Sequence, residues 1–85
     1  MDKFLKLNPE KKKRILEAAY NEFSRNTYDN ASTNRIVKEA GIGKGMLFFY
    51  FNSKKDLYIY LVEEGIEYIK REYVDKIDEN ETDFL

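Results

Sequence analysis

Residues 32–51 read STNRIVKEAGIGKGMLFFYF, an order that predicts two short helices joined by a tight turn. Ser32 and Thr33 carry the hydroxyl groups that commonly cap the start of a helix. Gly41 can adopt the left-handed conformation that ends the first helix, and the second is expected over Lys44–Phe51. Two short helices joined by a three-residue turn that contains glycine form a helix-turn-helix.

Apolar residues at helical spacing are expected to hold the angle between these two helices. They are Ile36, Ala40, Ile42, Leu47 and Tyr50. Ala40 is small where the helices would cross, and Ile42 would fill the corner of the turn. We therefore expect packing, as well as hydrogen bonds, to fix the turn.

The outer face of the 44–51 helix carries few charges. At 100° per residue, Leu47 and Phe51 point toward the core, whereas Gly45 and Phe49 point away from it. A solvated helix usually places charged residues on its outer face, but here the only cation is Lys44 at the tip. Such a face suits entry into a DNA groove, because glycine allows close approach and apolar side chains can contact thymine methyl groups.

Periodicity alone leaves an equal alternative for this helix. Met46, Phe48 and Phe49 could instead lie in the core or against another subunit.

The flanking sequence predicts a longer helix on each side. Asn8 followed by proline starts a helix over Pro9–Arg25, and the capping pattern Ser53-x-x-Asp56 starts another from Lys54 to about Lys76. Together these elements predict an all-α fold. It is a three-helix bundle with a helix-turn-helix, homeodomain-like, followed by a long fourth connecting helix.

Two runs, 46–51 and 57–62, are rich in aromatic or β-branched residues and could also form strands. The glycine turn and the capping pattern favour helices. A helix over 57–62 would be apolar on every side, yet the three preceding helices can cover only one side. We therefore expect either that the chain is a piece of a longer protein or that this face pairs with a second copy.

Composition excludes several functional classes. The 85 residues suffice for one domain, and they include neither cysteine nor histidine, so catalysis, a cofactor and a metal are not expected. The longest apolar runs have six residues, against about 20 for a membrane span, so no membrane partner is expected.

Charge is divided unequally along the chain. Residues 1–55 hold twelve Lys or Arg and six Asp or Glu, whereas residues 56–85 hold three and ten, which gives +6 and −7. The basic first part suggests that it meets a polyanion.

The sequence also resembles the N-terminal DNA-binding region of the tetracycline-repressor (TetR) family of bacterial regulators. The helix expected over Pro9–Arg25 carries Ile15-Leu16-x-Ala18-Ala19-x-x-x-Phe23. The longer motif runs from Ser32 through Ala40-Gly41-Ile42-Gly43-Lys44-Gly45-x-Leu47-Phe48-Phe49-Tyr50-Phe51-x-Ser53-Lys54 to Leu57. The likeness continues to about Ile69, so it covers roughly 60 residues.

The resemblance implies an organisation for the chain. Residues 1–8 would form an N-terminal arm, and residues 9–69 the DNA-binding domain, with its helix-turn-helix at about 33–52. Residues 70–85 would be the end of the fourth helix and the start of a C-terminal regulatory domain that this chain lacks.

The function that the resemblance implies is sequence-specific DNA binding by a cytoplasmic, bacterial transcription regulator that associates with the nucleoid when bound to DNA. It would be a homodimeric repressor that binds a palindromic operator and is released by a small-molecule effector in the C-terminal domain. The DNA-binding positions that carry over are Ser32, Thr33, Asn34, Lys44, Gly45, Met46, Phe48, Phe49, Tyr50 and Lys54.

Three positions depart from the family pattern. Gly43 stands where a hydroxyl residue often caps the recognition helix, Met46 replaces a common threonine, and Phe48 replaces a common tyrosine. These departures leave the operator sequence open.

The sequence also allows two other classes of function. A helix-turn-helix can serve as a protein-interaction module without binding DNA. The carboxylates of Glu63, Glu64 and Glu67 could suggest a metal-dependent enzyme, but a solvated helix face with Lys70 and Arg71 nearby is the stronger interpretation.

Overall fold

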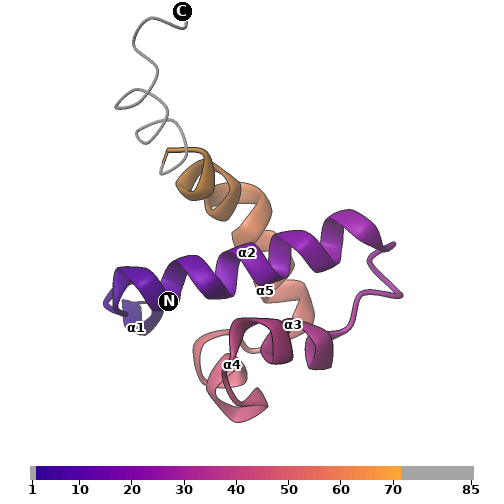
Figure 1. The fold of residues 1–85 in the computed structure, drawn as a ribbon, viewed down its shortest axis with the longest axis horizontal. Helices are drawn as coiled ribbons and strands as arrows, with labels where there is room; N and C mark the ends of the chain where they lie inside the picture. The colour runs from indigo at the N-terminus through magenta and orange to yellow at the C-terminus, as the bar shows by residue number, and fades with distance from the viewer. Residues whose placement is uncertain (1, 72–85) are drawn as a thin grey trace, which may run out of the picture.

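The computed structural model describes residues 2–71, which are all-helical and contain no strand (Figure 1). The strand alternative for 46–51 and 57–62 is therefore wrong. The elements in chain order are α1 (Asp2–Leu5), α2 (Pro9–Arg25), α3 (Thr33–Ala40), α4 (Lys44–Tyr50), α5 (Lys54–Tyr60) and the π-helical segment η1 (Leu61–Gly65), which continues as α-helix over 66–71.

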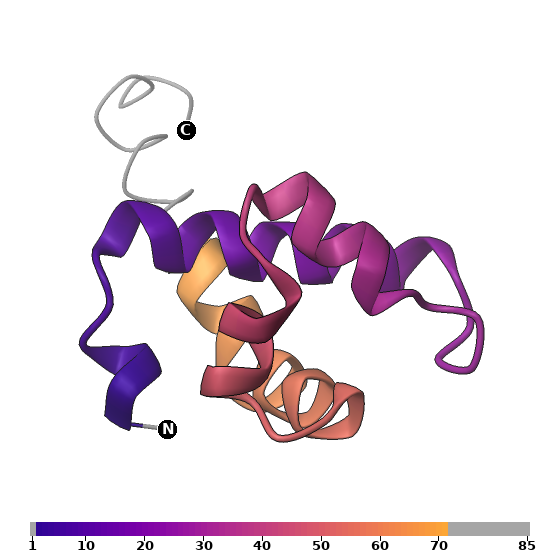
Figure 2. The same cartoon turned by 90° about the horizontal axis from the view of Figure 1, so that it is seen from below.

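The longest regular helix, α2, begins as the sequence predicts. The Asn8 side-chain oxygen accepts a hydrogen bond from the Glu10 N–H at 2.7 Å, and Pro9 occupies the first helical position. Its buried stripe comprises Ile15, Leu16, Ala18, Ala19 and Glu22. Figures 1 and 2 show α1 at one end of α2 and the 26–31 loop at the other.

The turn between α3 and α4 confirms the expected geometry. Gly41 has φ = 74°, the left-handed conformation that glycine adopts without steric cost. Its N–H and that of Ile42 both donate to the Val37 carbonyl, at 2.9 and 3.0 Å. These bonds satisfy the end of α3 and set the direction in which α4 leaves.

Packing of α4 also follows the helical projection. The side chains of Leu47 and Phe51 are each 1% exposed, so they face the core as expected. Ile42 and Tyr50 are partly buried against the same core, which also contains Ile36 and Ala40. Figure 2 shows α4 lying between α1 and α5.

The segment expected to form an N-terminal arm contains a short helix in its described part, residues 2–8. Residues 2–5 form the helix α1, and the Phe4 side chain is completely buried. Its ring contacts those of Tyr50, Phe51 and Tyr60, with centroids 5.8, 5.0 and 5.4 Å apart. Phe4 therefore belongs to the hydrophobic core and ties α1 to α4 and α5, whereas the division of the chain after residue 8 stays a prediction.

The long fourth helix is present but is not uniform. Ser53 caps it by accepting a hydrogen bond from the Asp56 N–H at 3.1 Å, and it continues to residue 71 through η1. The expected end near Lys76 lies outside the described residues. Gly65 sits close to α2, since a Cβ there would lie 3.2 Å from Leu16 Cδ2 and 2.9 Å from Leu61 Cδ1. A side chain at this position would force neighbouring groups to shift.

One face of this helix is left uncovered by the other described elements, as the apolar pattern predicts. Leu57 and Leu61 are buried, but Tyr58, Ile59 and Val62 are 37, 39 and 53% exposed. No helix within residues 2–71 has the length and apolar character needed to cross a membrane.

Candidate nucleic-acid interface

The outer face of α4 is open and almost uncharged. Phe49 is 59% exposed and Met46 36%, and Lys44 and Gly45 are exposed at the start of the helix. A Cβ added at Gly45 would meet no atom within 4 Å, so packing inside the protein does not require glycine there. Met46 and Phe49 are therefore not in the core of this chain and Phe48 is only half-buried, whereas the alternative that these residues pack against another subunit stays open.

Phe48 and Tyr50 are less accessible than Phe49. Both are half-buried, and the Tyr50 ring lies edge-on to the rings of Phe4 and Phe49, with centroids 5.8 and 5.3 Å away. Gly45, Met46 and Phe49 therefore lie on one exposed face of α4, with Lys44 at the tip of the helix and Phe48 and Tyr50 at the margin of the face.

Gly43 leaves the start of α4 without a side-chain cap, as the departure from the family pattern predicts. Its carbonyl accepts hydrogen bonds from the N–H groups of Met46 and Leu47, at 3.1 and 3.2 Å. The first N–H groups of a helix have no partner within the helix. Gly43 has no side chain that could cap the N–H groups at the tip of α4.

The start of α3 contributes a second group of polar residues. Ser32 Oγ accepts a hydrogen bond from the Arg35 N–H at 3.2 Å, which confirms its expected role as helix cap. Thr33 is half-buried and Asn34 is exposed. The position of α3 against α2 thus sets where these three side chains meet the surface.

Glu22 fixes the position of α3 against α2. This residue was not identified from the sequence. One of its carboxylate oxygens accepts hydrogen bonds from the Ser32 N–H at 2.9 Å, from Arg35 Nε at 2.9 Å and from Asn26 Nδ2 at 3.2 Å. The same oxygen lies 2.8 Å from Arg35 Nη2. The hydrogen bond from Arg35 is the main reason that the pKa of Glu22 is lowered. The sequence did contain a sign of this role, because Glu22 lies on the apolar stripe of α2 and a buried carboxylate needs hydrogen-bond partners.

Lys54 is engaged within the protein. Its Nζ donates to the carbonyl oxygens of Tyr28, Ala31 and Asp29, at 2.7, 3.2 and 3.5 Å, and lies 4.5 Å from the centroid of the Tyr28 ring. An ammonium group has three donors, and these carbonyls can occupy all of them. Lys54 therefore fastens the loop that leads into α3, and its contact with a DNA phosphate stays a prediction.

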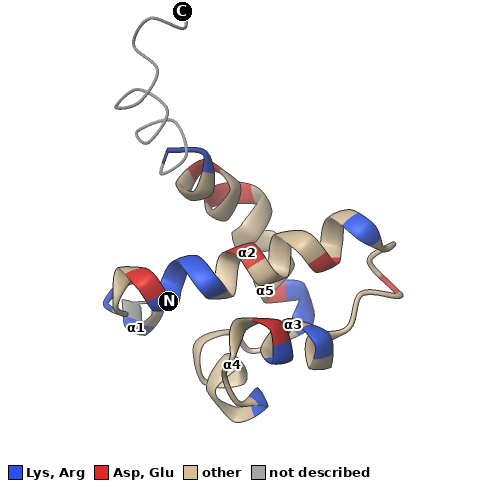
Figure 3. Ribbon diagram, in the orientation of Figure 1, with Lys and Arg blue, Asp and Glu red and all other residues tan. Residues whose placement is uncertain are grey.

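Charges are segregated over the surface as the sequence indicates. Figure 3 shows Lys and Arg on α1, at both ends of α2, on α3 and at the starts of α4 and α5, whereas carboxylates gather on η1 and the helical turn after it, which ends in Lys70 and Arg71. A polyanion would therefore be attracted to the side of the molecule that carries α3 and α4.

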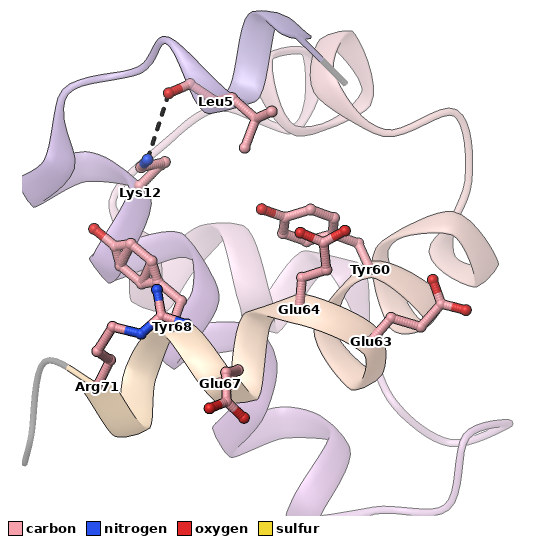
Figure 4. Close-up of a pocket in the computed structure, with 8 residues that line it drawn as sticks. All are labelled: Leu5, Lys12, Tyr60, Glu63, Glu64, Glu67, Tyr68 and Arg71. Carbon is pink, nitrogen blue, oxygen red and sulfur yellow. Dashed lines mark hydrogen bonds between the residues drawn. The ribbon is translucent and has the colours of Figure 1, made fainter.

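The acidic cluster lines a separate, shallow pocket (Figure 4). Its lining residues are Leu5, Lys12, Tyr60, Glu63, Glu64, Glu67, Tyr68 and Arg71. Burial, and then the negative charge of Glu64, raise the pKa of Tyr60. Within residues 2–71, no group of acidic or other ligating side chains is arranged to hold a metal ion. The pocket is thus a mixed-charge surface beside α1.

Comparison with known proteins adds independent information. Residues 15–61 match the family described as bacterial regulatory proteins, tetR family. An HTH-type transcriptional regulator of Staphylococcus aureus strain USA300 is 40% identical over 58 residues, which are 68% of this chain and 31% of that protein. An HTH-type transcriptional regulator of the Staphylococcus aureus bovine strain RF122 / ET3-1 is 33% identical over 75 residues. These residues are 88% of this chain and 40% of that regulator.

The chain therefore spans between about a third and two fifths of the length of these relatives. No solved structure is significantly similar to it.

Proposed function

This chain belongs to the tetR family of bacterial regulatory proteins. We propose that it is a DNA-binding transcriptional regulator and that α4 is the helix with which it reads the DNA sequence. Regulators of this family bind DNA and are not enzymes. The proposal for α4 depends on one observation above all, which is the open face formed by Gly45, Met46 and Phe49 with Lys44 exposed at the tip of the helix.

The chemistry of this face suits the major groove. The groove is about 12 Å wide and admits an α-helix, and base pairs are distinguished there by hydrogen-bonding groups and by the thymine methyl. Gly45 lets the backbone approach the bases, Met46 and Phe49 would contact thymine methyl groups, and Lys44 would reach a guanine edge or a phosphate. Phe48 and Tyr50 would contact the groove wall.

The start of α3 would contact the DNA backbone. Ser32, Thr33 and Asn34 present hydroxyl and amide groups at the positive end of a helix dipole, which favours a phosphate. Lys54 would act mainly by holding the loop that leads into α3. Its positive charge would add to the attraction between the protein and DNA.

The experiment is the binding of a random-sequence duplex by the 85-residue chain, measured by fluorescence anisotropy over a series of salt concentrations. With four to six phosphate contacts, the logarithm of the binding constant should fall with the logarithm of salt with a slope of about −4 to −5. Lys44→Ala should weaken binding and reduce the magnitude of this slope by about 1.

The matched control is Lys70→Ala. It removes the same charge from the 66–71 segment, which lies across α2 from α4 in Figure 1, and it should leave the slope unchanged. Equal slopes for the wild type and Lys44→Ala would contradict the assignment of α4. They would favour the other function considered, a helix-turn-helix that contacts protein.

The exposed apolar face of α5 and η1 supports a further part of the proposal. Tyr58, Ile59 and Val62 are exposed there, together with Tyr20 of α2, and such a patch commonly marks an interface. We propose that it packs against a C-terminal helical domain of the full-length protein. That domain would form the homodimer and bind a small-molecule effector.

In this arrangement two heads would bind the half-sites of a palindromic operator, about one helical turn or a multiple of it apart. The effector would release the repressor from DNA. The protein would act in the bacterial cytoplasm, at the nucleoid.

A further inference from the structure

The short helix α1 lies against the end of α4. Phe4 is completely buried, and its ring contacts Tyr50, the last residue of α4, and Phe51, which follows it. The Leu7 N–H donates to the Phe4 carbonyl at 3.1 Å, and Lys12 Nζ donates to the Leu5 carbonyl at 3.4 Å. These contacts give α1 a defined position beside the proposed recognition helix.

This position places a cation on the open face of α4. Lys3 Nζ lies 4.2 Å from the centroid of the Phe49 ring. An ammonium group is attracted to the face of an aromatic ring, so this contact orients the Lys3 side chain. Phe49 itself is 59% exposed and Lys3 is also exposed, so the ammonium group remains accessible to a ligand.

Lys3 and Lys44 consequently mark the two ends of α4. Lys44 is its first residue, and Phe49 follows after a rise of about 7.5 Å at 1.5 Å per residue. A helix that enters the major groove would therefore carry a cation near each of its ends.

We propose that Lys3 is a DNA-binding residue, which contacts a backbone phosphate beside the groove that Phe49 enters. This inference rests on the proposed function of α4 and extends the interface to an element outside the helix-turn-helix. Phe4 acts as the anchor that sets the position of Lys3, and the Phe49 ring holds its ammonium group. The contact would add affinity without sequence preference, because phosphates carry no sequence information.

The test compares Lys3→Ala, Lys3→Arg and the wild type in the salt series with a random-sequence duplex. Lys3→Ala should weaken binding roughly three- to tenfold at about 50 mM salt and reduce the magnitude of the salt slope by about 1. Lys3→Arg keeps the charge and should retain the wild-type slope. Thermal unfolding of both variants should match the wild type, because Lys3 is exposed.

The Lys44→Ala and Lys70→Ala variants separate the possible failures. If Lys44→Ala lowers the slope but Lys3→Ala does not, Lys3 only packs on Phe49, and the inference is wrong while the assignment of α4 stands. If neither variant lowers the slope, the assignment of α4 fails as well. A loss with Lys70→Ala equal to that with Lys3→Ala would show an effect of total charge and would also overturn the inference.

Discussion

Replacement of Phe4 by alanine is expected to lower the free energy of unfolding by about 3–5 kcal/mol. The side chain is completely buried and contacts three aromatic rings, so its removal leaves a cavity between α1, α4 and α5. A domain of this size has little stability in reserve. Urea denaturation followed by circular dichroism at 222 nm gives the measurement.

The matched control is Phe49→Ala, which removes the same side chain from an exposed position. Phe49 is 59% exposed, so we expect its loss to change the free energy of unfolding by only about 0.5 kcal/mol. Equal effects of the two substitutions would contradict the burial of Phe4. The α1 segment would then be a dispensable arm.

The second large effect is expected at Glu22. Glu22→Ala should lower the free energy of unfolding by about 1–3 kcal/mol at pH 7, because it removes the acceptor for the Ser32 N–H and for the charged donors of Arg35. Arg35→Ala should cost less, since the carboxylate would still bind Ser32 and Asn26. Urea titration of the two variants provides the comparison. A larger loss with Arg35→Ala would contradict the central role of the carboxylate.

The contribution of Glu22 should also depend on pH, with a fixed sign. Its pKa is lower in the folded chain than the ordinary value of 4.5, so unfolding raises its affinity for a proton. The resulting stability is complete above that ordinary value and is lost as the pH falls through the lowered pKa. The difference between the wild type and Glu22→Ala should therefore shrink below about pH 4. A difference independent of pH from 3 to 7 would contradict the charged hydrogen bonds.

The helix-turn-helix could be predicted because its determinants are local. Gly41 is the residue type that the left-handed conformation at the end of α3 requires, and its φ of 74° confirms that role. The alternation that buries Leu47 and exposes Phe49 follows from helical geometry alone. Neither result depends on contacts between distant parts of the chain.

The features that were missed or assigned differently depend on such contacts. Phe4 lies in a short segment with lysines on both sides, and only the distant rings of Phe51 and Tyr60 make its burial favourable. The family pattern implies a phosphate contact for Lys54, which stays a prediction, but it gives no sign that the ammonium group also binds loop carbonyls more than twenty residues earlier in the chain. The spacing of residues along the sequence does not predict these contacts of Phe4 and Lys54.

The central claim, that the open face of α4 enters the DNA groove, is tested most directly by NMR. Backbone amide signals of the 15N-labelled chain would be followed while a duplex is added at low salt. The account predicts that the largest shifts fall within residues 44–50, with smaller ones at 32–34 and near Lys3. Unchanged signals in α4, with the largest shifts at Tyr20, Tyr58 and Val62 instead, would contradict it.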